Sequence, residues 1–184
     1  MSAAEAAVVA VQLWPASAVV TAVAIAGSES DWTLSAVGDR PDQFDPAVRA
    51  ELLPWTCPPN TPTAPTSIGP WQVNLSNYAI LPYHTNCQNQ SWLLASWANN
   101  AKAAHALWLR DGFGPWTSYV DGRYRAYLPQ AQVAVTAALA SAPSPPPAST
   151  MGTVLARRPS LLFVALGLLG LVGLGAVGDG EIHR

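Results

Sequence analysis

The stretch AVAIAGSESDW, residues 22–32, decides how the rest of the sequence is interpreted. It is apolar for more than a helical turn, and it places Glu29 where the apolar run stops. Only 11% of the residues in the chain are charged, so a carboxylate at this position needs an explanation. One explanation is a solvated helix terminus. The other is a general acid that apolar surroundings keep protonated, because burial disfavours the charged form of a carboxyl group.

Length and composition restrict the classes of function. The chain has 184 residues, which is enough for one ordinary domain with appendages. Half of the residues are apolar and eight are Trp, so a substantial core is expected. A net charge of −2 gives no basic surface for nucleic acid, and no glycine-rich nucleotide-binding motif is present. We therefore expect no nucleic-acid partner and no cofactor.

Composition divides the chain into four parts. Residues 1–140 are predicted to form a globular domain. Residues 141–158 begin with SAPSPPPAST and form a Pro-rich linker that includes an Arg pair. Residues 159–178 are predicted to be a transmembrane helix, and 179–184 a short polar tail.

The membrane prediction rests on the run from Leu161 to Val177, which has 17 residues without a charge or a strongly polar group. As a helix it is about 26 Å long, at the short end of what crosses a bilayer. A buried core helix is the alternative, but the run follows a linker and has no polar face. Arg157 and Arg158 precede it, so the positive-inside rule places the domain on the cytoplasmic side at insertion.

Within the domain, apolar periodicity and turn residues predict a mainly helical structure. The expected segments are an Ala-rich first helix ending near Pro15, a helix over 15–29 capped by Ser17, loops over 38–48 and 54–70, an extended segment WQVNL, and helices over 91–110 and 123–140. Six prolines lie within 54–70 and exclude regular structure there.

Two cysteines, Cys57 and Cys87, are present. A zinc site needs more ligands, and His84 alone is near in sequence, so no metal site is predicted. Two interpretations stay open: isolated core thiols, or a disulfide that encloses the 29 residues between them. In the loop-entropy model such a disulfide adds roughly 3–4 kcal/mol of stability.

The order of four motifs points to a family. Glu29-Ser30 is followed by SIGPWQVN from residue 67, by NNAKAAHALW from residue 99 and by GPWTSYVDGRYRAYL from residue 114. This order resembles the lysozyme-like lytic transglycosylase (SLT) domain, in the compact form found in actinobacteria and their phages. The resemblance covers roughly residues 15–130. It implies a mainly α, lysozyme-like α+β fold.

The resemblance also implies a site. Glu29 stands where the family has its catalytic acid and base, and Gly69, Trp71 and Gln72 match the second motif. Pro70 replaces the usual Leu, and the family's Ala-Tyr-Asn-Ala-Gly motif is missing; SYVDG is its nearest counterpart. The residues expected to bind substrate are Ser30, Gly69, Trp71, Gln72, Asn74 and Tyr119.

The number of carboxylates bears on the reaction. A glycoside hydrolase normally uses two carboxylates at a defined separation. The sequence spacing places none of the nearby aspartates opposite Glu29; these are Asp31, Asp39, Asp42 and Asp45. A lytic transglycosylase needs one carboxylate, because the 6-hydroxyl of N-acetylmuramic acid attacks its own anomeric carbon from a tethered position.

The sequence therefore predicts a peptidoglycan lytic transglycosylase that splits the MurNAc-GlcNAc β-1,4 bond and forms 1,6-anhydroMurNAc. Its expected partners are glycan strands, a lipid membrane through Leu161 to Val177, and other virion membrane proteins. The expected location is a phage virion membrane or a host cell membrane, by analogy with membrane-containing phages. Two alternatives remain: a lysozyme-type hydrolase, and a non-enzymatic glycan-binding or structural membrane protein with a degenerate lysozyme fold.

Overall fold

The computed structural model describes residues 2–141. The predicted membrane helix and polar tail, and the linker beyond Ser141, lie outside the described residues. Within residues 2–141, none of the helices combines the length and apolar character that crossing a membrane requires.

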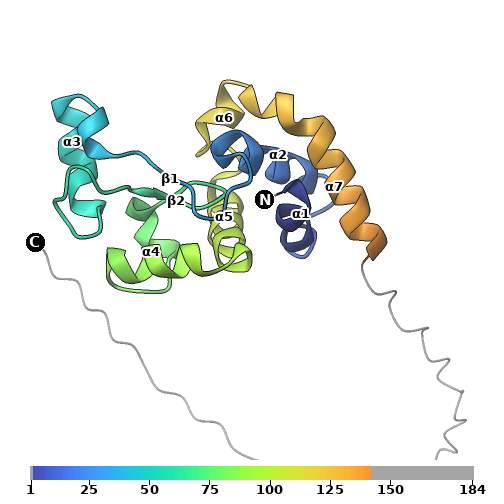
Figure 1. The fold of residues 1–184 in the computed structure, drawn as a ribbon, viewed down its shortest axis with the longest axis horizontal. Coiled ribbons are helices and arrows are strands. Elements are labelled where there is room, and N and C mark those ends of the chain that lie inside the picture. The colour runs from blue at the N-terminus through green and yellow to red at the C-terminus, as the bar shows by residue number, and fades with distance from the viewer. Residues whose placement is uncertain (1, 142–184) are drawn as a thin grey trace, which may run out of the picture. The chain divides into compact units, whose positions relative to one another are not determined.

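The described part of the chain is mainly helical, as the sequence predicts (Figure 1). Its α-helices are α1 Ala3–Ala10, α2 Val19–Ser30, α3 Pro46–Leu52, α4 Asn86–Ala95, α5 Trp97–Asp111, α6 Thr117–Val120 and α7 Leu128–Ser141. Its 3₁₀-helices are η1 Pro41–Gln43, η2 Leu53–Trp55, η3 Leu75–Ile80 and η4 Arg123–Tyr127. Its strands are β1 Val37–Gly38, β2 Ser67–Ile68 and β3 Val73–Asn74.

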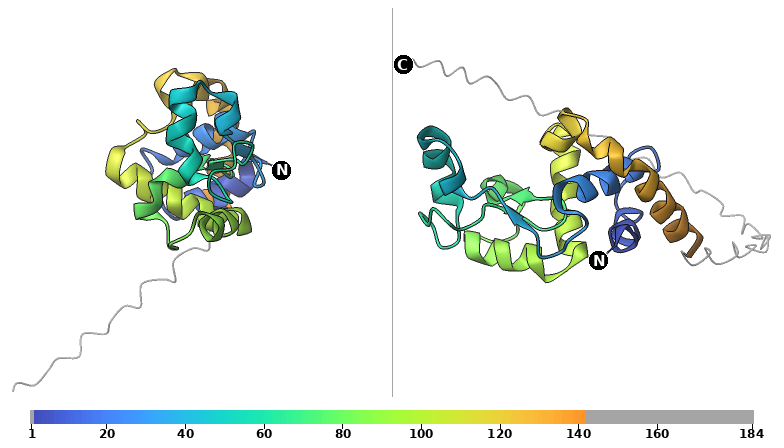
Figure 2. Two further views of the ribbon diagram at one scale, coloured as in Figure 1. Left: turned by 90° about the vertical axis from the view of Figure 1, so that its left-hand side faces the viewer. Right: turned by 45° about the horizontal axis from the view of Figure 1, so that its top comes forward.

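The core forms where α1, α2 and α7 pack together (Figures 1 and 2). All three helices are rich in alanine, and small side chains let helix backbones approach closely. The stretch 22–27 of α2 is buried throughout. This explains why the most apolar run of the domain is also its central helix.

Helix α2 begins later than predicted. Pro15 starts a turn instead, because its carbonyl accepts hydrogen bonds from Ala18 N and Val19 N at 2.9 and 3.0 Å. The N-cap is Ala18 and not Ser17. At the other end Asp31 takes the left-handed conformation with φ 50° and donates its N–H to the carbonyl of Gly27. The helix therefore ends one turn after the apolar run.

The helix predicted over 91–110 is two helices, α4 and α5. The break is at Ser96, whose backbone is extended and whose hydroxyl accepts a hydrogen bond from Asn99 N at 3.1 Å. This serine is an N-cap, a signal that the continuous apolar spacing hides. Helix α5 ends at Asp111-Gly112 as predicted.

The predicted loop over 38–48 holds more structure than expected. It contains η1 and the beginning of α3, where the Asp45 carboxylate accepts hydrogen bonds from Ala47 N and Val48 N and Pro46 is the first helical residue. Segment 54–70 is largely irregular, as its prolines predict, apart from η2 and β2. The last predicted helix is η4 followed by α7.

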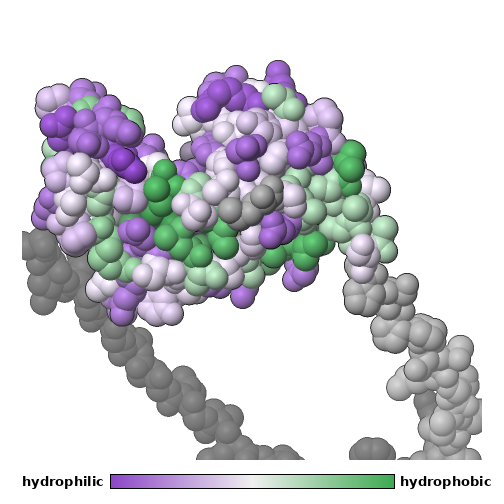
Figure 3. All heavy atoms as spheres, in the orientation of Figure 1, coloured by the Kyte–Doolittle hydropathy of each residue, from purple (hydrophilic) through white to green (hydrophobic). Residues whose placement is uncertain are grey.

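The three strands form a small antiparallel sheet in the order β1-β2-β3. Val37 pairs with Ile68, and Ser67 pairs with Asn74. The sheet brings β1 against β2 and β3, which follow it by about 30 residues in the sequence. On the face shown in Figure 3 the surface is hollowed between the part that carries α3 and the part that carries α6, and apolar residues gather around this hollow.

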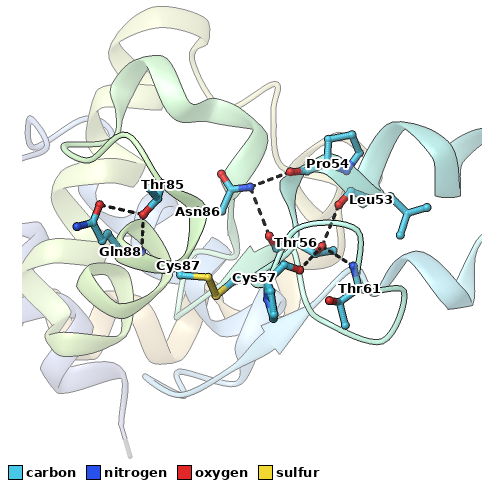
Figure 4. Close-up of a disulfide and its surroundings, with 10 residues drawn as sticks. Leu53, Pro54, Thr56, Cys57, Thr61, Thr85, Asn86, Cys87 and Gln88 are labelled. Carbon is cyan, nitrogen blue, oxygen red and sulfur yellow. Dashed lines mark hydrogen bonds between the residues drawn. A yellow bond between two sulfur atoms is a disulfide. The ribbon is translucent and has the colours of Figure 1, made fainter.

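A disulfide joins Cys57 to Cys87, with 4.9 Å between their Cα atoms (Figure 4). Of the two alternatives that the sequence left open, the structure has the disulfide. It ties the Pro-rich segment to the first turn of α4. Asn86 adds a second tie, because its side-chain amide donates a hydrogen bond to the carbonyl of Pro54 at 2.8 Å.

Candidate active-site cleft

A cleft of about 390 Å³ lies where the end of α2 meets the small sheet. Its lining residues come from five separate segments: Glu29, Asp39, Ser67, Gln72, Asn74, Pro115, Trp116, Thr117 and Arg123. Three residues that the sequence singled out, Glu29, Gln72 and Asn74, are therefore brought together.

Glu29 is half-buried in the last turn of α2. Its Oε1 accepts a hydrogen bond from the backbone N–H of Ser118 at 3.2 Å. Ser118 belongs to α6, so a segment 89 residues away in sequence fixes one oxygen of this carboxyl group. Within residues 2–141, no hydrogen bond to the other oxygen is formed.

The surroundings of Glu29 are more polar than the sequence suggested. The buried apolar residues 22–26 of α2 belong to the hydrophobic core. On the cleft side Arg123 stands near instead. Its ion pair with Asp121, at 2.6 Å, and the nearby Glu29 carboxylate raise the pKa of the Arg123 guanidinium. The cleft thus places a permanent positive charge near Glu29.

Asp39 also lines the cleft, a placement that the sequence spacing did not indicate. Its carboxylate accepts a hydrogen bond from the hydroxyl of Ser67, 28 residues away. Its carbonyl accepts another from the hydroxyl of Thr66 at 2.8 Å. The pairing of β1 with β2 creates this contact, and a two-residue strand is too short to give a periodic signal in the sequence.

The other three aspartates do not line this cleft. Asp45 caps α3 and Asp31 ends α2. Asp42 is exposed in η1.

Gly69 and Trp71, also predicted as substrate contacts, do not line the cleft. Gly69 has φ +78°, and a Cβ added there would lie 2.2 Å from Nδ2 of Asn100. Trp71 is only 1% exposed, so it has no face to offer a sugar. Its indole N–H donates to the carbonyl of Ala22 at 2.8 Å, and its ring stacks on Trp14.

Gln72 and Asn74 reach the cleft because of the turn that Gly69 begins. Gln72 has φ +46°, and its side-chain amide donates to the carbonyl of Gly69 at 2.8 Å. Asn74 Nδ2 donates to the hydroxyl of Ser67 at 3.2 Å, and its Oδ1 accepts from Ser76 N at 2.9 Å. Asn74 therefore lines the cleft and caps η3 at the same time.

Ser30 and Tyr119 do not line the cleft. The hydroxyl of Ser30 is bound within its own turn, to the carbonyl of Ala26 at 2.8 Å and to Thr33 N at 3.2 Å. Tyr119 is 37% exposed and packs against Phe113 and Tyr124. The structure therefore does not bring these two side chains into the cleft with Glu29.

The part of α6 that matters is the segment just before Tyr119. Trp116 and Thr117 line the cleft, and Ser118 holds Glu29. The indole N–H of Trp116 donates to the carbonyl of Trp71 at 2.6 Å, which ties α6 to the SIGPWQVN segment. In the sequence, the SYVDG motif indicated this region, but it favoured Tyr119 over Ser118 and the two residues before it.

Among the residues that the structure describes, no group of three His, Cys, Asp or Glu side chains is placed to hold a metal ion. The polar side chains that line the cleft carry two carboxyl groups, one at the end of α2 and one just after β1, together with two amides, two hydroxyls and one guanidinium. No protein-family model matches the chain, and neither a curated protein nor a solved structure matches it significantly.

Proposed function

We propose that this chain is a peptidoglycan lytic transglycosylase with a lysozyme-like α+β fold and that Glu29 is its catalytic acid and base. The observation that carries the proposal is the position of Glu29. A half-buried carboxyl group at a helix end, held through one oxygen, lies in a cleft whose other walls carry the amides of Gln72 and Asn74. Amide groups are suited to the hydroxyl and N-acetyl groups of a glycan strand.

The proposed reaction needs one carboxyl group. Protonated Glu29 donates its proton to the glycosidic oxygen as the bond from C1 of MurNAc breaks. The 6-hydroxyl of the same sugar attacks C1, and the Glu29 carboxylate takes the hydroxyl proton. The products are a GlcNAc-ended strand and 1,6-anhydroMurNAc, and no water is consumed. Gln72 and Asn74 orient the N-acetyl group.

A lysozyme-type hydrolase is the second candidate, and one observation favours it. Asp39 lies in the same cleft as Glu29 and is held by Ser67. In a hydrolase this second carboxylate activates a water or stabilises the positive charge that develops on the sugar. The two reactions differ in their products, so the reducing end of the released fragments decides between them.

The test is mass analysis of the fragments that the full-length chain releases from purified peptidoglycan sacculi. We expect Glu29→Gln to lower the rate at least about 100-fold, because it removes general acid catalysis without changing the shape of the side chain. Glu51→Gln is the matched control, because Glu51 is an exposed glutamate on α3 outside the cleft.

The products that the wild-type chain releases distinguish the transglycosylase from the hydrolase. Anhydro-muramyl ends that are lost in Glu29→Gln and persist in Asp39→Asn support the transglycosylase. Reducing ends that are lost in both variants, but not in the control Asp42→Asn, identify a hydrolase. If the folded wild-type chain releases nothing, the enzyme proposal fails and the non-enzymatic glycan-binding alternative takes its place.

The membrane part of the proposal rests on the sequence. The apolar run from Leu161 to Val177 is proposed to anchor the domain in a phage virion membrane or a host cell membrane, beside other virion membrane proteins. An anchored domain would act on glycan strands within reach of its linker.

A further inference from the structure

A second cavity, of about 580 Å³, lies between η2, η3 and the first turn of α4. It shares no lining residue with the cleft of Glu29. Trp55 and Tyr78 line it, and their rings stack with 5.4 Å between centroids and 11° between planes. Tyr78 is 60% exposed and Tyr83 is 43% exposed, so two aromatic side chains meet solvent at this cavity.

The cavity is built from segments that the fold holds firmly. The disulfide between Cys57 and Cys87 fixes η2 next to α4 (Figure 4). The buried side chain of Asn89 donates to the carbonyl of Tyr83 and accepts from its N–H, both at 3.0 Å. A ligand would therefore find the aromatic groups already in place, which lowers the entropy lost on binding.

The chemistry of the lining favours an uncharged ligand with both apolar and hydrogen-bonding surface. None of its residues is Asp, Glu, Lys or Arg. The side-chain amide nitrogen of Asn86 contacts the carbonyls of Pro54 and Thr56, while its oxygen is turned away from them (Figure 4). This oxygen can accept from a hydroxyl or an amide N–H, and the tyrosine hydroxyls can do both.

A saccharide has the matching surface. The C–H faces of a pyranose ring pack against aromatic rings, and its hydroxyl and N-acetyl groups form hydrogen bonds around the edge. Exposed, preformed aromatic groups beside uncharged polar groups are what such a ligand requires. An anionic ligand would find no countercharge among these residues.

We propose that this aromatic pocket, formed by Trp55, Tyr78, Tyr83, His84, Asn86 and Asn89, binds a stretch of β-1,4-linked N-acetylhexosamines outside the catalytic cleft. The choice of this glycan rests on the proposed function, whereas the pocket itself rests on the geometry above. A second contact with the same polymer holds the chain on its substrate between cleavage events and raises the effective concentration of strand at Glu29.

The test uses the full-length chain with Glu29→Gln, so that the ligand is not cleaved, and a hexamer of β-1,4-linked N-acetylglucosamine as the probe. Backbone amide resonances of residues 78–86 should shift on titration. Tyr78→Ala should abolish these shifts and weaken binding at this pocket about tenfold, because an exposed stacking face is lost. Shifts around Ser118, which report the catalytic cleft, should remain.

Two control variants sharpen the result. Tyr78→Phe keeps the ring and should keep the binding, whereas a requirement for the hydroxyl alone would remove it and overturn the stacking argument. Leu109→Ala removes a side chain that is exposed and lies outside the pocket, and it should change nothing. Tyr78 is mostly exposed, so an unchanged urea transition shows that Tyr78→Ala is folded.

The two proposals fail in different ways. If the hexamer shifts only residues near Ser118, or if Tyr78→Ala binds as its parent does, the aromatic pocket is not a glycan site, whatever the wild-type chain does to sacculi. If the wild-type chain releases no fragments but the hexamer still binds through Tyr78, the enzyme proposal fails and the pocket stands as a glycan-binding site.

Discussion

At the residue scale, Gly69 lies beside the candidate cleft without lining it. It begins the turn that brings Gln72 and Asn74 to the cleft, and it lies directly against the side chain of Asn100. That amide donates to the carbonyl of Ile68 at 2.9 Å and accepts from Trp71 N at 3.1 Å. A motif in the sequence names Gly69 and Trp71, but their physical role is to position their neighbours.

Gly69→Ala should therefore destabilise the domain strongly. A non-glycine residue at φ +78° is strained, and the new Cβ would lie far too close to Asn100. We expect the free energy of unfolding, measured in urea, to fall by about 2–4 kcal/mol. Gly122→Ala is the matched control: its φ is +82°, but its Cβ would meet nothing closer than 3.7 Å. Equal losses in the two variants would contradict the role given to Asn100.

At the scale of elements, helix boundaries depend on one or two local hydrogen bonds. Ser96 divides one periodic apolar stretch into α4 and α5, and Pro15 delays the start of α2. The segment between η2 and β2 has no helix or strand, and a disulfide links it to α4. The disulfide, together with Asn86, takes the place of secondary structure there.

Loss of the disulfide should destabilise the domain. Cys57→Ser with Cys87→Ser removes a cross-link between residues 30 apart, so the unfolded chain gains conformational freedom. The expected fall in the free energy of unfolding is about 3–4 kcal/mol. Wild-type protein treated with a reductant should show a similar fall, and the double variant should not respond to the reductant. A wild-type transition that reduction leaves unchanged would refute this.

At the scale of the whole molecule, aromatic side chains connect the helical core to α5. Trp14 stacks on Trp71 and meets His105 edge-on, and His105 stacks on Trp108. This row joins the turn before α2, the SIGPWQVN segment and α5. Burial lowers the pKa of His105 from its usual value of 6.5, because the charged imidazolium is poorly solvated there.

His105 should therefore make global stability depend on pH. The unfolded chain takes up a proton near pH 6.5, and the folded chain does so only at lower pH. The contribution of His105 to the free energy of unfolding is thus complete above about pH 6.5. It falls as the pH drops from there toward the pKa of the folded state, and below that pKa stability no longer changes with the protonation of His105. Urea unfolding at several pH values should show a smaller loss toward low pH in His105→Phe than in the wild type. Identical slopes would show that burial does not oppose protonation of His105.

The sequence by itself determined the mainly helical class and the irregular Pro-rich segment, and it singled out Glu29, Gln72 and Asn74 as candidate site residues. The first two follow from local patterns, namely apolar spacing in α2 and α5 and prolines over 54–70, whereas the site residues follow from motifs that resemble those of a known family. Such patterns act between residues that are near in the chain, so they are visible without the fold.

Only the tertiary structure decided which residues share the cleft with Glu29. Asp39 enters the cleft through β1, whose two residues carry no period, and Ser118 reaches Glu29 from α6. Trp71 and Tyr119, which the motifs favoured, do not line the cleft: Trp71 is buried in the core, and Tyr119 packs against Phe113 and Tyr124. These placements depend on contacts between segments 28 to 89 residues apart, which local patterns do not encode.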